Sequence, residues 1–399
     1  MRRTKRGLWI LVLALAACGG EEGLEGDGPG GWSAERADEG KTDDPADDPA
    51  SPDPRPYLSL LTFNTGLARG AVALAEERRA LIIDALKRAE NQADVVCLQE
   101  VWTDDDAGAV QDALRGVYPH FFREKTEDTG KKSAPCGIWS TYQLDRCVKN
   151  NCAAQGISTE ECVQTKCAER YDALSDECKL CLAANTTSPT WCAIWPGAPS
   201  YAWEGRNGLL LLSRHPIENP RYTAFDTQLI KRGLITARIK QTTVHCTHLS
   251  ADLKVVPYPE GHDATSWVEE QARQVVTIQN NTPEKTCTVL MGDLNTGPQT
   301  GALAGEVPGT FNLLILAGFE EPWTAPRCTW CTDNPLTGSE TDRQLDHIMV
   351  HGCYNKQLAY QRVLDAKTLV PLPEKTLLSR LSDHYGLKVE MATVMPPVK

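Results

Sequence analysis

Polar side chains able to bind a divalent metal ion or to transfer protons recur along this chain directly after short apolar segments. Asn64, Glu100 and His248 each end such a segment. Carboxylate and amide oxygens suit Mg²⁺ or Mn²⁺, and histidine is the most frequent proton-transfer residue. Each residue alone has an ordinary explanation as a turn, a strand end or a core histidine, but chance explains the whole succession poorly. The candidates are Asn64, Glu100, His248, Asp293, Asn295, Asp346, Asp383 and His384.

The segments that position these residues alternate between strands and helices. Apolar residues at helical spacing predict helices over residues 75–88 and 266–279, and Ser266 with Glu269 forms a possible capping box. The alternation predicts an α/β layered domain, in which strand ends bring side chains together on one rim. The predicted strands cover residues 57–64, 94–99, 209–213, 236–239, 243–247, 286–291, 345–350 and 385–390, the fourth and fifth as an antiparallel pair.

The first 18 residues have the pattern of an export signal. Basic residues precede an apolar run over residues 8–17 that is too short to span a bilayer, and Cys18 follows small residues. This order resembles a bacterial lipobox with Cys18 as the lipidated residue; the alternative is an ordinary secretory peptide. Residues 19–56 are acidic and rich in Gly and Pro, which predicts a disordered linker. We therefore expect export and lipid anchoring to the bacterial cell envelope, at the outer membrane or the cell surface.

Fifteen cysteines in an exported chain favour disulfide bonds. Eight of them lie within residues 136–192, which predicts a cysteine-rich insertion over residues 131–200. Antiparallel helices there would permit nested bridges 147–167 and 152–162, although eight cysteines allow 105 pairings. Zinc binding is the alternative, and the absence of histidine from the insertion disfavours it. Cys328-x2-Cys331 alone is a weak zinc motif. No candidate residue lies in the insertion, so we expect it to be separable from catalysis.

Taken together, these segments resemble the endonuclease/exonuclease/phosphatase superfamily of metal-dependent phosphoesterases. GDLN and SDH together with LQE are a specific combination, and several motifs are most similar to the neutral sphingomyelinase branch. The resemblance implies a four-layer α/β/β/α sandwich over residues 57–399, interrupted by the insertion. The matching motifs are LTFNTG (61–66), LQEVW (98–102), YPHFFR (118–123), NGLLLLSRHPI (207–217), THLSAD (247–252), MGDLNTGP (291–298), QLDHIMV (344–350) and LSDHYGL (381–387).

The resemblance also implies a metal site. Glu100, with Asn64 nearby, would hold Mg²⁺, and Mn²⁺ is a possible substitute. Asp383 would serve a second metal position, and the sequence leaves open whether one or two ions operate. The bound metal would polarise a phosphoryl oxygen.

The resemblance further implies that the remaining candidates act in proton transfer and substrate positioning. His384 would activate water while Asp346 orients its ring. Asp293 and Asn295 would position water and phosphate. His248 would hydrogen-bond the phosphoryl group or the leaving oxygen, which makes His384 and His248 the predicted proton-transfer pair.

Three classes of function fit these residues. The first is a phospholipase C-type phosphodiesterase acting on sphingomyelin or a related phospholipid at the membrane. The second is a secreted deoxyribonuclease-like endonuclease, and the third, which the complete set of polar motifs disfavours, is a non-catalytic surface lipoprotein. A net charge of −12 argues weakly against nucleic-acid binding. Against a lipid substrate, the segment between Asp346 and Asp383 has no tandem aromatic pair, and offers only LVPL at residues 369–372. We predict the lipid enzyme, as a monomer.

Overall fold

The computed structural model describes residues 57–125, 130–132, 136–151, 163, 166–185, 191–194, 198–254, 256–321, 327–353, 357–373 and 375–392. The predicted signal, Cys18 and the acidic linker lie outside these residues. Among the described residues, no helix is long and apolar enough to cross a membrane.

The first of two large sheets has six strands in the order β12-β15-β1-β2-β6-β3. Strands β1 and β2 are parallel, and the other neighbours pair antiparallel. Both faces of its centre are covered, which explains why β2 is buried at every position. The strands are β1 (Tyr57–Asn64), β2 (Val95–Gln99), β3 (His120–Phe122), β6 (Leu210–Ser213), β12 (Gln357–Val363) and β15 (Gly386–Ala392).

The second sheet has five strands in the order β11-β10-β9-β8-β7. Strands β9 and β10 are parallel, which pairs the last residues of both, His248 and Asp293. Strands β10 and β11 are antiparallel, which places Asp293 opposite Asp346. Strand register alone therefore brings three candidate residues together. The strands are β7 (Glu218–Ala224), β8 (Gly233–Ile239), β9 (Thr242–His248), β10 (Thr288–Asp293) and β11 (Asp346–His351).

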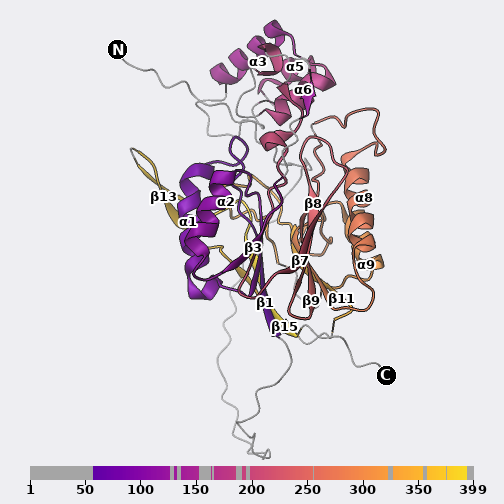
Figure 1. Ribbon diagram of the computed structural model, residues 1–399. Coiled ribbons are helices and arrows are strands. Elements are labelled where there is room, and N and C mark those ends of the chain that lie inside the picture. Colours follow the sequence, from indigo (N-terminus) through magenta and orange to yellow (C-terminus); the bar gives the residue numbers. More distant parts are fainter. Residues whose placement is uncertain are drawn as a thin grey trace, which may run out of the picture.

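The elements stack in four layers, as the sequence predicted (Figure 1). The two sheets pack face to face through a core of buried aliphatic side chains. Helices α1 (Ala75–Lys87) and α2 (Asp104–Leu114) cover the outer face of the first sheet. Helices α8 (Trp267–Asn280) and α9 (Pro308–Leu316) cover the second. The fold is thus an α/β/β/α sandwich with disulfide bonds.

A disulfide bond also joins the two sheets through this core. Cys97 of β2 and Cys246 of β9 are both fully buried and bonded to each other. Glu100 follows Cys97 by three residues and His248 follows Cys246 by two. The crosslink therefore lies directly beneath the strand ends that carry candidate residues.

The predicted strands and helices are present, with ends that differ by at most three residues. Ser266 caps α8 as predicted, because its side chain accepts the N–H of Glu269. The other half of the capping box differs: the Glu269 carboxylate accepts the N–H of Thr265 instead. The sequence analysis missed α2 and α9 and several edge strands, among them the hairpin of β13 (Thr368–Pro371) and β14 (Thr376–Ser379). Short edge strands and a largely apolar helix carry little periodic signal.

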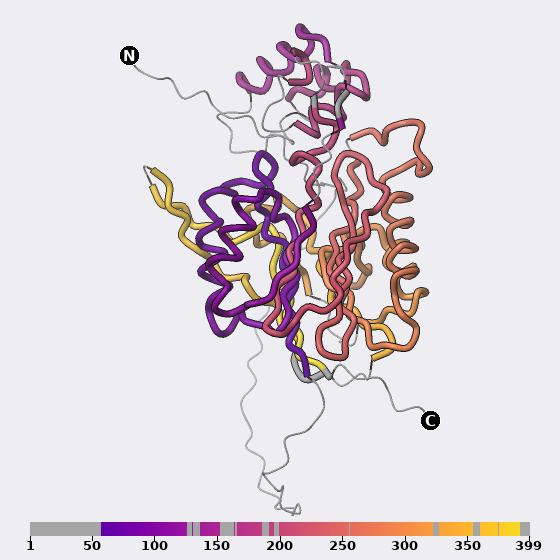
Figure 2. The backbone as a smooth tube through the Cα atoms, viewed as in Figure 1, coloured from indigo at the N-terminus to yellow at the C-terminus, as the bar shows by residue number. Residues whose placement is uncertain are grey.

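The cysteine-rich insertion lies at one end of the sandwich (Figure 2). It has a small core of its own, and the 147–167 bridge is formed as predicted, together with 136–178 and 181–192. Cys152 and Cys162 lie outside the described residues. The described elements are β4 (Lys131–Lys132), α3 (Ile138–Asn151), α5 (Ala168–Asp172), α6 (Asp176–Ala184), α7 (Trp191–Ile194) and β5 (Ala198–Pro199).

The insertion also packs on the rest of the domain. Ala183 and Ala184 of α6 share a core cluster with Leu229, Leu253 and Trp267. Ala183 in addition lines the pocket that contains the candidate residues. The separability of the insertion from catalysis stays a prediction, and Ala183 is a residue through which the insertion reaches the pocket. A small apolar residue can shape a pocket without belonging to any catalytic motif.

Candidate active site

Asn64 links two carboxylates at the ends of the central strands. Its Nδ2 donates to Glu100 Oε1 at 3.2 Å and to Asp293 Oδ2 at 2.9 Å. Its Oδ1 accepts the N–H of Gly66 at 3.0 Å. The structure thus places Asn64 in the site, as a bridge between the two carboxylates. Its carbonyl oxygen keeps a second lone pair, so its role as a metal ligand stays a prediction.

His384 and Asp346 lie together as the sequence predicted. His384 Nδ1 is 2.8 Å from Asp346 Oδ2, and both residues are buried. Thr329 Oγ1 accepts the backbone N–H of Asp346 at 3.1 Å, which fixes the start of β11. Since an ionised carboxylate only accepts, Nδ1 donates, and Nε2 lies 3.6 Å from Asp293. This arrangement orients the ring with Nε2 toward the other candidate residues.

His248 is held from both sides of its ring. Its Nε2 lies 3.3 Å from Asp293 Oδ2 and 3.1 Å from Asn295 Nδ2. Its Nδ1 lies 2.7 Å from a guanidinium nitrogen of Arg232. A guanidinium only donates, so Nδ1 accepts, and the neutral ring carries its hydrogen on Nε2. His248 therefore presents a hydrogen-bond donor to the site.

Asp383 packs against a position that only glycine can occupy. A β-carbon at Gly66 would lie 2.4 Å from Asp383 Oδ1, and Gly66 has a φ of 55°. The same oxygen accepts a hydrogen bond from Ser382 Oγ at 2.9 Å. The loop after β1 thus approaches the Asp383 carboxylate closely, on the side of the site where Asn64 lies.

Two candidate residues have a left-handed backbone. Glu100 has a φ of 61° and Asn295 a φ of 46°. Asparagine adopts this conformation readily, whereas a strained residue such as Glu100 costs on the order of 1–3 kcal/mol. Both side chains line the same pocket. Strain of this kind is concentrated at functional sites, which supports a role for Glu100.

Burial and charge shift the pKa values of the carboxylates in opposite directions. Burial, reinforced by Asp383, raises the pKa of Glu100 to about 7. Burial also favours a raised pKa at Asp293, but the positive charge of His384 and the hydrogen bonds from His248 and Asn64 outweigh it and hold that pKa well below its usual range. Burial together with Asp293 raises the pKa of Asp346. The site therefore brings several buried carboxylates close to one another.

The two histidines differ in charge. Burial lowers the pKa of His248 to about 4, and the neighbouring Arg232 contributes in the same direction. Burial also opposes charge on His384, but Asp346 and Asp293 outweigh it and raise its pKa well above the usual value. His248 is therefore neutral near pH 7. In this state its Nε2–H is a hydrogen-bond donor, and the pairing of His384 with His248 in proton transfer stays a prediction.

The donor atoms fit a divalent cation. Glu100 Oε2 and Asp346 Oδ1 are buried and lack hydrogen-bond partners. A buried carboxylate oxygen without a partner costs free energy unless a cation satisfies it. Ligand atoms of Asp293, Asp346 and His384 lie within 4.8 Å of one another. Hard oxygen ligands of this kind suit Mg²⁺ or Mn²⁺, with Glu100 and Asp293 as the residues that would hold it.

A single pocket of about 130 Å³ contains these groups. Its polar lining includes the candidate residues Glu100, His248, Asp293, Asn295, Asp383 and His384, together with Arg232, Glu306 and Arg343. Its other part is an apolar wall built from loops and from α6 of the insertion. This apolar wall consists of Ala68, Val72, Ala183, Leu229, Ile230 and Leu253.

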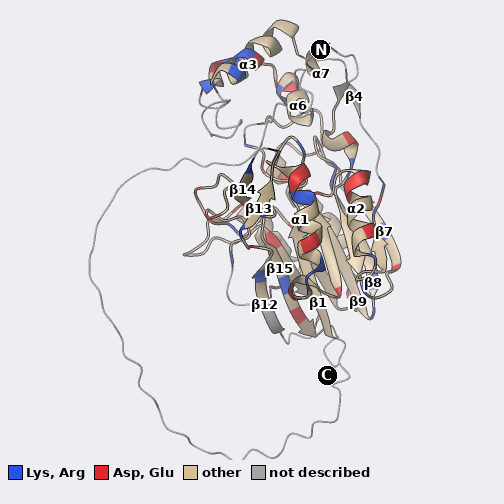
Figure 3. Cartoon of the chain, turned by 90° about the vertical axis from the view of Figure 1, so that its left-hand side faces the viewer, with Lys and Arg blue, Asp and Glu red and all other residues tan. Residues whose placement is uncertain are grey.

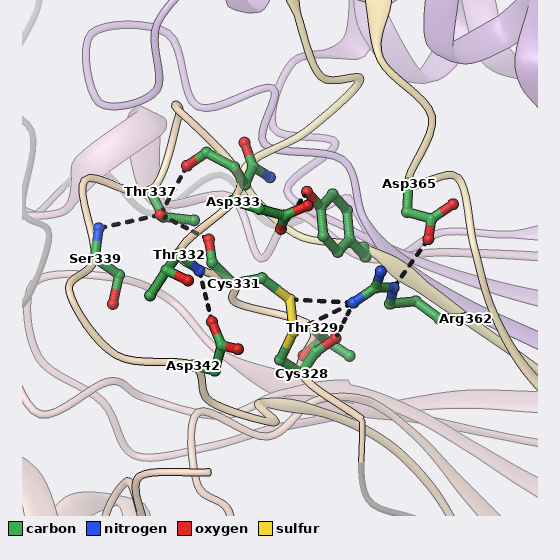
Figure 4. Close-up of a disulfide and its surroundings, with 12 residues drawn as sticks. Cys328, Thr329, Cys331, Thr332, Asp333, Thr337, Ser339, Asp342, Arg362 and Asp365 are labelled. Carbon is green, nitrogen blue, oxygen red and sulfur yellow. Dashed lines mark hydrogen bonds and ion pairs between the residues drawn. A yellow bond between two sulfur atoms is a disulfide. The ribbon is translucent and has the colours of Figure 1, made fainter. Parts of the chain in front are cut away.

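A short loop closed by a disulfide carries an aromatic side chain that contacts the candidate base. Figure 4 shows this disulfide with Arg362 beside it. Cys328 and Cys331 are bonded to each other, so the zinc alternative fails for this pair. Between them, Trp330 contacts the His384 ring edge-on, with centroids 4.8 Å apart. Arg362 Nη1 lies 3.2 Å from Cys328 Sγ and 3.5 Å from Cys331 Sγ. The loop therefore supports the position of His384.

The pocket residues that the sequence analysis missed include Arg232, Trp203 and Trp330. Trp203 has a φ of 47° and stacks on Trp102 with centroids 4.2 Å apart. Neither tryptophan nor the arginine belongs to a repeating pattern. Their proximity to the site depends on loops that fold back from elsewhere in the chain, and sequence spacing carries no signal of it.

Comparison with known proteins identifies the class of this fold and site. Residues 61–158 and 170–384 match the endonuclease/exonuclease/phosphatase family. The chain therefore belongs to this family, whose members hydrolyse phosphoric esters. No protein with a curated description matches the sequence.

Solved structures similar to this chain include a bacterial sphingomyelinase C and a bacterial toxin. Sphingomyelinase C from Streptomyces griseocarneus has a TM-score of 0.50 and 16% identity, over 84% of this chain and 99% of that one. A magnesium-bound beta toxin variant from Staphylococcus aureus has a TM-score of 0.51 and 14% identity, over 83% and 98%. SmcL has a TM-score of 0.51 and 16% identity, over 84% and 99%. At these identities the similarity establishes the fold.

Proposed function

We propose that this protein is an exported, metal-dependent phosphodiesterase that hydrolyses the head-group phosphodiester of a phospholipid in the manner of a phospholipase C. Hydrolysis of a phosphoric ester, the general activity, follows from family membership. The similarity to Streptomyces sphingomyelinase C and to a magnesium-bound beta toxin supports the lipid substrate and the metal ion.

One observation carries the proposal: the polar groups and the apolar wall share one pocket. A phosphodiester bound at Glu100, Asp293 and His384 has an apolar surface beside it, formed in part by Leu229 and Leu253. Burial of hydrocarbon against such a surface contributes roughly 25 cal/mol per Å². A nucleic-acid site needs basic residues for several neighbouring phosphates, whereas the pocket lining has two, Arg232 and Arg343, and Arg343 is paired with Glu306. The composition of the pocket therefore favours a substrate with an apolar group next to its phosphate.

The proposed reaction uses water as the nucleophile. Asp346 holds the His384 ring, and His384 Nε2 takes a proton from the attacking water while the water oxygen bonds to phosphorus. The bond between phosphorus and the lipid oxygen breaks, and that oxygen takes a proton from solvent. When bound, a divalent ion supplies positive charge that polarises a phosphoryl oxygen and lowers the pKa of His384 toward that of a base. The products are a lipid alcohol and the phosphorylated head group.

Neighbouring side chains align the phosphate for this attack. His248 offers its Nε2 hydrogen to a phosphoryl oxygen, and Asn295 lies 3.1 Å from that nitrogen. Asn64 fixes the separation of Glu100 and Asp293 through its two hydrogen bonds. Alignment of this kind accelerates a reaction because the groups need no reorganisation when the transition state forms.

A substrate panel tests the proposal. Sphingomyelin, phosphatidylcholine and plasmid DNA are offered at matched Mg²⁺ and salt, with and without chelator, and the His384→Ala variant controls for contaminating enzymes. We expect chelator-sensitive release of phosphocholine and a loss of roughly 10²–10⁴-fold in turnover for the variant. Rapid nicking of plasmid without phosphocholine release would instead support the endonuclease alternative.

A further inference from the structure

Arg232 is a buried cation at the wall of the active-site pocket. It immediately precedes β8, and its side chain lines the pocket together with Glu100 and His248. Only 4% of its surface is exposed to solvent. Burial lowers its pKa to about 10, which leaves the guanidinium charged at neutral pH. A buried charge of this kind is costly unless a group of opposite charge accompanies it.

The described residues leave part of this guanidinium without a partner. Within them, the side chain makes one hydrogen bond, to His248 Nδ1 at 2.7 Å, and its Nε has none. The carboxylates of Glu100, Asp293 and Glu270 act on it over a longer distance. A divalent cation bound by Glu100 and Asp293 would offset two of these charges. The guanidinium would then be free to pair with an incoming anion.

The guanidinium is also held in one orientation. Its Cζ lies 5.4 Å from the centre of the Trp102 ring, and Trp102 stacks on Trp203. Gly208 leaves space for this tryptophan, because a β-carbon at Gly208 would lie 2.8 Å from the Trp102 ring. A planar guanidinium held on an aromatic face keeps its donors pointing in a fixed direction. Such a group loses little entropy when it binds an oxyanion.

We propose that Arg232 binds a non-bridging oxygen of the substrate phosphate through its unpaired guanidinium nitrogens. The proposal deepens the proposed function, since it takes the phosphodiester as ligand, but it holds for any phosphodiester. The fork of donors matches a tetrahedral oxyanion better than a lysine ammonium would. Arg232 and His248 then approach the phosphate from the same side of the pocket. Arg232 therefore gives the site its specificity for an anionic group.

Inhibition by inorganic phosphate tests this role. The assay follows hydrolysis of bis(para-nitrophenyl) phosphate at fixed Mg²⁺ by the full-length enzyme and by Arg232→Lys. We expect the inhibition constant of phosphate and the KM of the substrate to rise on the order of 10–100-fold, the usual worth of a charge-assisted hydrogen bond. Arg238→Lys is the matched control, because Arg238 lies on β8, the strand that Arg232 precedes, but is exposed and paired with Glu218.

Measurements in a His248→Ala variant distinguish two roles of Arg232: binding phosphate and positioning His248. Arg232→Lys is repeated in His248→Ala, where an arginine that only orients His248 would have no further effect. We expect phosphate inhibition to weaken in both backgrounds. An unchanged inhibition constant in a folded Arg232→Lys variant overturns the proposal. So does an effect of Arg232→Lys that is seen with His248 present but disappears in the His248→Ala variant.

The wild-type protein provides an independent measurement. A crystal structure with Mg²⁺ and inorganic phosphate should place a phosphate oxygen within hydrogen-bond distance of the Arg232 guanidinium, and a phosphate bound elsewhere in the pocket would contradict this. Failure of the proposed function is a different result. In that case sphingomyelin is not hydrolysed, yet the effect of Arg232→Lys on phosphate inhibition persists.

Discussion

The chemistry at the scale of single residues depends on carboxylates that are buried but not neutralised. Glu100 combines a left-handed backbone, a raised pKa and an oxygen without a partner. Each of these features costs free energy in the protein alone. A bound divalent cation would give the unpartnered Glu100 oxygen a partner and would favour the charged form of the carboxylate. Glu100 is thus the residue at which metal binding should be most sensitive to substitution.

We therefore predict that Glu100→Gln weakens metal activation. The amide keeps the shape of the side chain but removes its charge, so the Mg²⁺ concentration for half-maximal activity should rise at least roughly 10-fold. Titration of a chelated enzyme with Mg²⁺ or Mn²⁺ measures this. Glu90→Gln, at an exposed position, should leave the titration unchanged. Activity that resists chelator in the wild type would remove the basis of the prediction.

Adjacent residues of β11 serve opposite sides of the second sheet. Asp346 contacts His384, whereas His347 is 2.5 Å from Glu321 through Nδ1 and 2.8 Å from the carbonyl oxygen of Thr296 through Nε2. The strand alternation therefore assigns His347 to structure and not to catalysis. Burial opposes charge on this ring, but Glu321 outweighs it and raises the pKa of His347.

This pair predicts a pH-dependent stability. The pKa of His347 is raised on folding, so its contribution is complete below the unfolded value of about 6.5 and is lost as the pH rises through the folded value. Glu321→Gln should lower the free energy of unfolding by roughly 1–3 kcal/mol near pH 6 and by less near pH 9. Urea denaturation at both pH values measures it, with the exposed Glu260→Gln as control. A loss that is equal at both pH values would exclude the charged pair.

The sequence predicted the members of the site better than their contacts. Placement at strand ends identified Glu100, His248 and Asp293, because parallel strands end at the same edge. It did not predict that Asn64 uses its oxygen on Gly66, since both carbonyl oxygen and amide nitrogen are compatible with the same motif. Arg232 was missed because its neighbours come from loops distant in sequence. Tertiary packing determines such contacts, and the periodicity of the sequence carries no information about them.

At the scale of elements, the strand register and one crosslink set the geometry of the site. The parallel β9 and β10 place His248 beside Asp293. Strand β2, which carries Glu100 at its end, belongs to the other sheet, and the Cys97–Cys246 disulfide fixes β2 relative to β9. The distance between the two halves of the site therefore depends on how the sheets are held together.

We predict that removing this disulfide affects both stability and activity. Cys97→Ala with Cys246→Ala should lower the free energy of unfolding by roughly 2–4 kcal/mol and should also reduce turnover, since the sheets can shift. The matched control is Cys287→Ala with Cys353→Ala, a bond at the opposite end of β10 and β11. The control should lose stability but keep its turnover in the folded state. Equal turnover in both double variants would contradict a positioning effect.

The insertion contributes an element to the pocket as well. Helix α6 exposes Ala183 to the pocket, whereas the next residue, Ala184, belongs to the same core cluster without lining it. Ala183→Leu should narrow the apolar wall and reduce hydrolysis of sphingomyelin more than that of a small aryl phosphodiester. Ala184→Leu controls for overpacking, which costs roughly 1–3 kcal/mol in either variant. Identical substrate ratios in the two variants would show that α6 does not shape the site.

At the scale of the whole molecule, charge and architecture follow from the sequence to different degrees. Acidic residues occupy the first turns of α1 and α2, and Figure 3 shows them on these helices. The net charge of −12 gives long-range repulsion toward duplex DNA. The alternation of strands and helices predicted a layered α/β domain, and the family resemblance implied the four layers of the sandwich. The disulfide between the sheets has no counterpart in sequence spacing, since its cysteines lie 149 residues apart.

The proposed anchor at Cys18 predicts how the molecule reaches its substrate. Residues 19–56 would connect the lipidated cysteine to the sandwich and keep the enzyme near a membrane, which raises the local concentration of phospholipid. Stable attachment takes more than one acyl chain, so loss of the modified cysteine should release the protein. Cys18→Ser should therefore move the protein to the soluble fraction and reduce hydrolysis of vesicle-bound sphingomyelin at low enzyme concentration. Turnover of detergent-solubilised substrate should stay the same, because the folded domain is unchanged. Membrane fractionation and the two assays measure this, and continued membrane association of Cys18→Ser would refute the anchor.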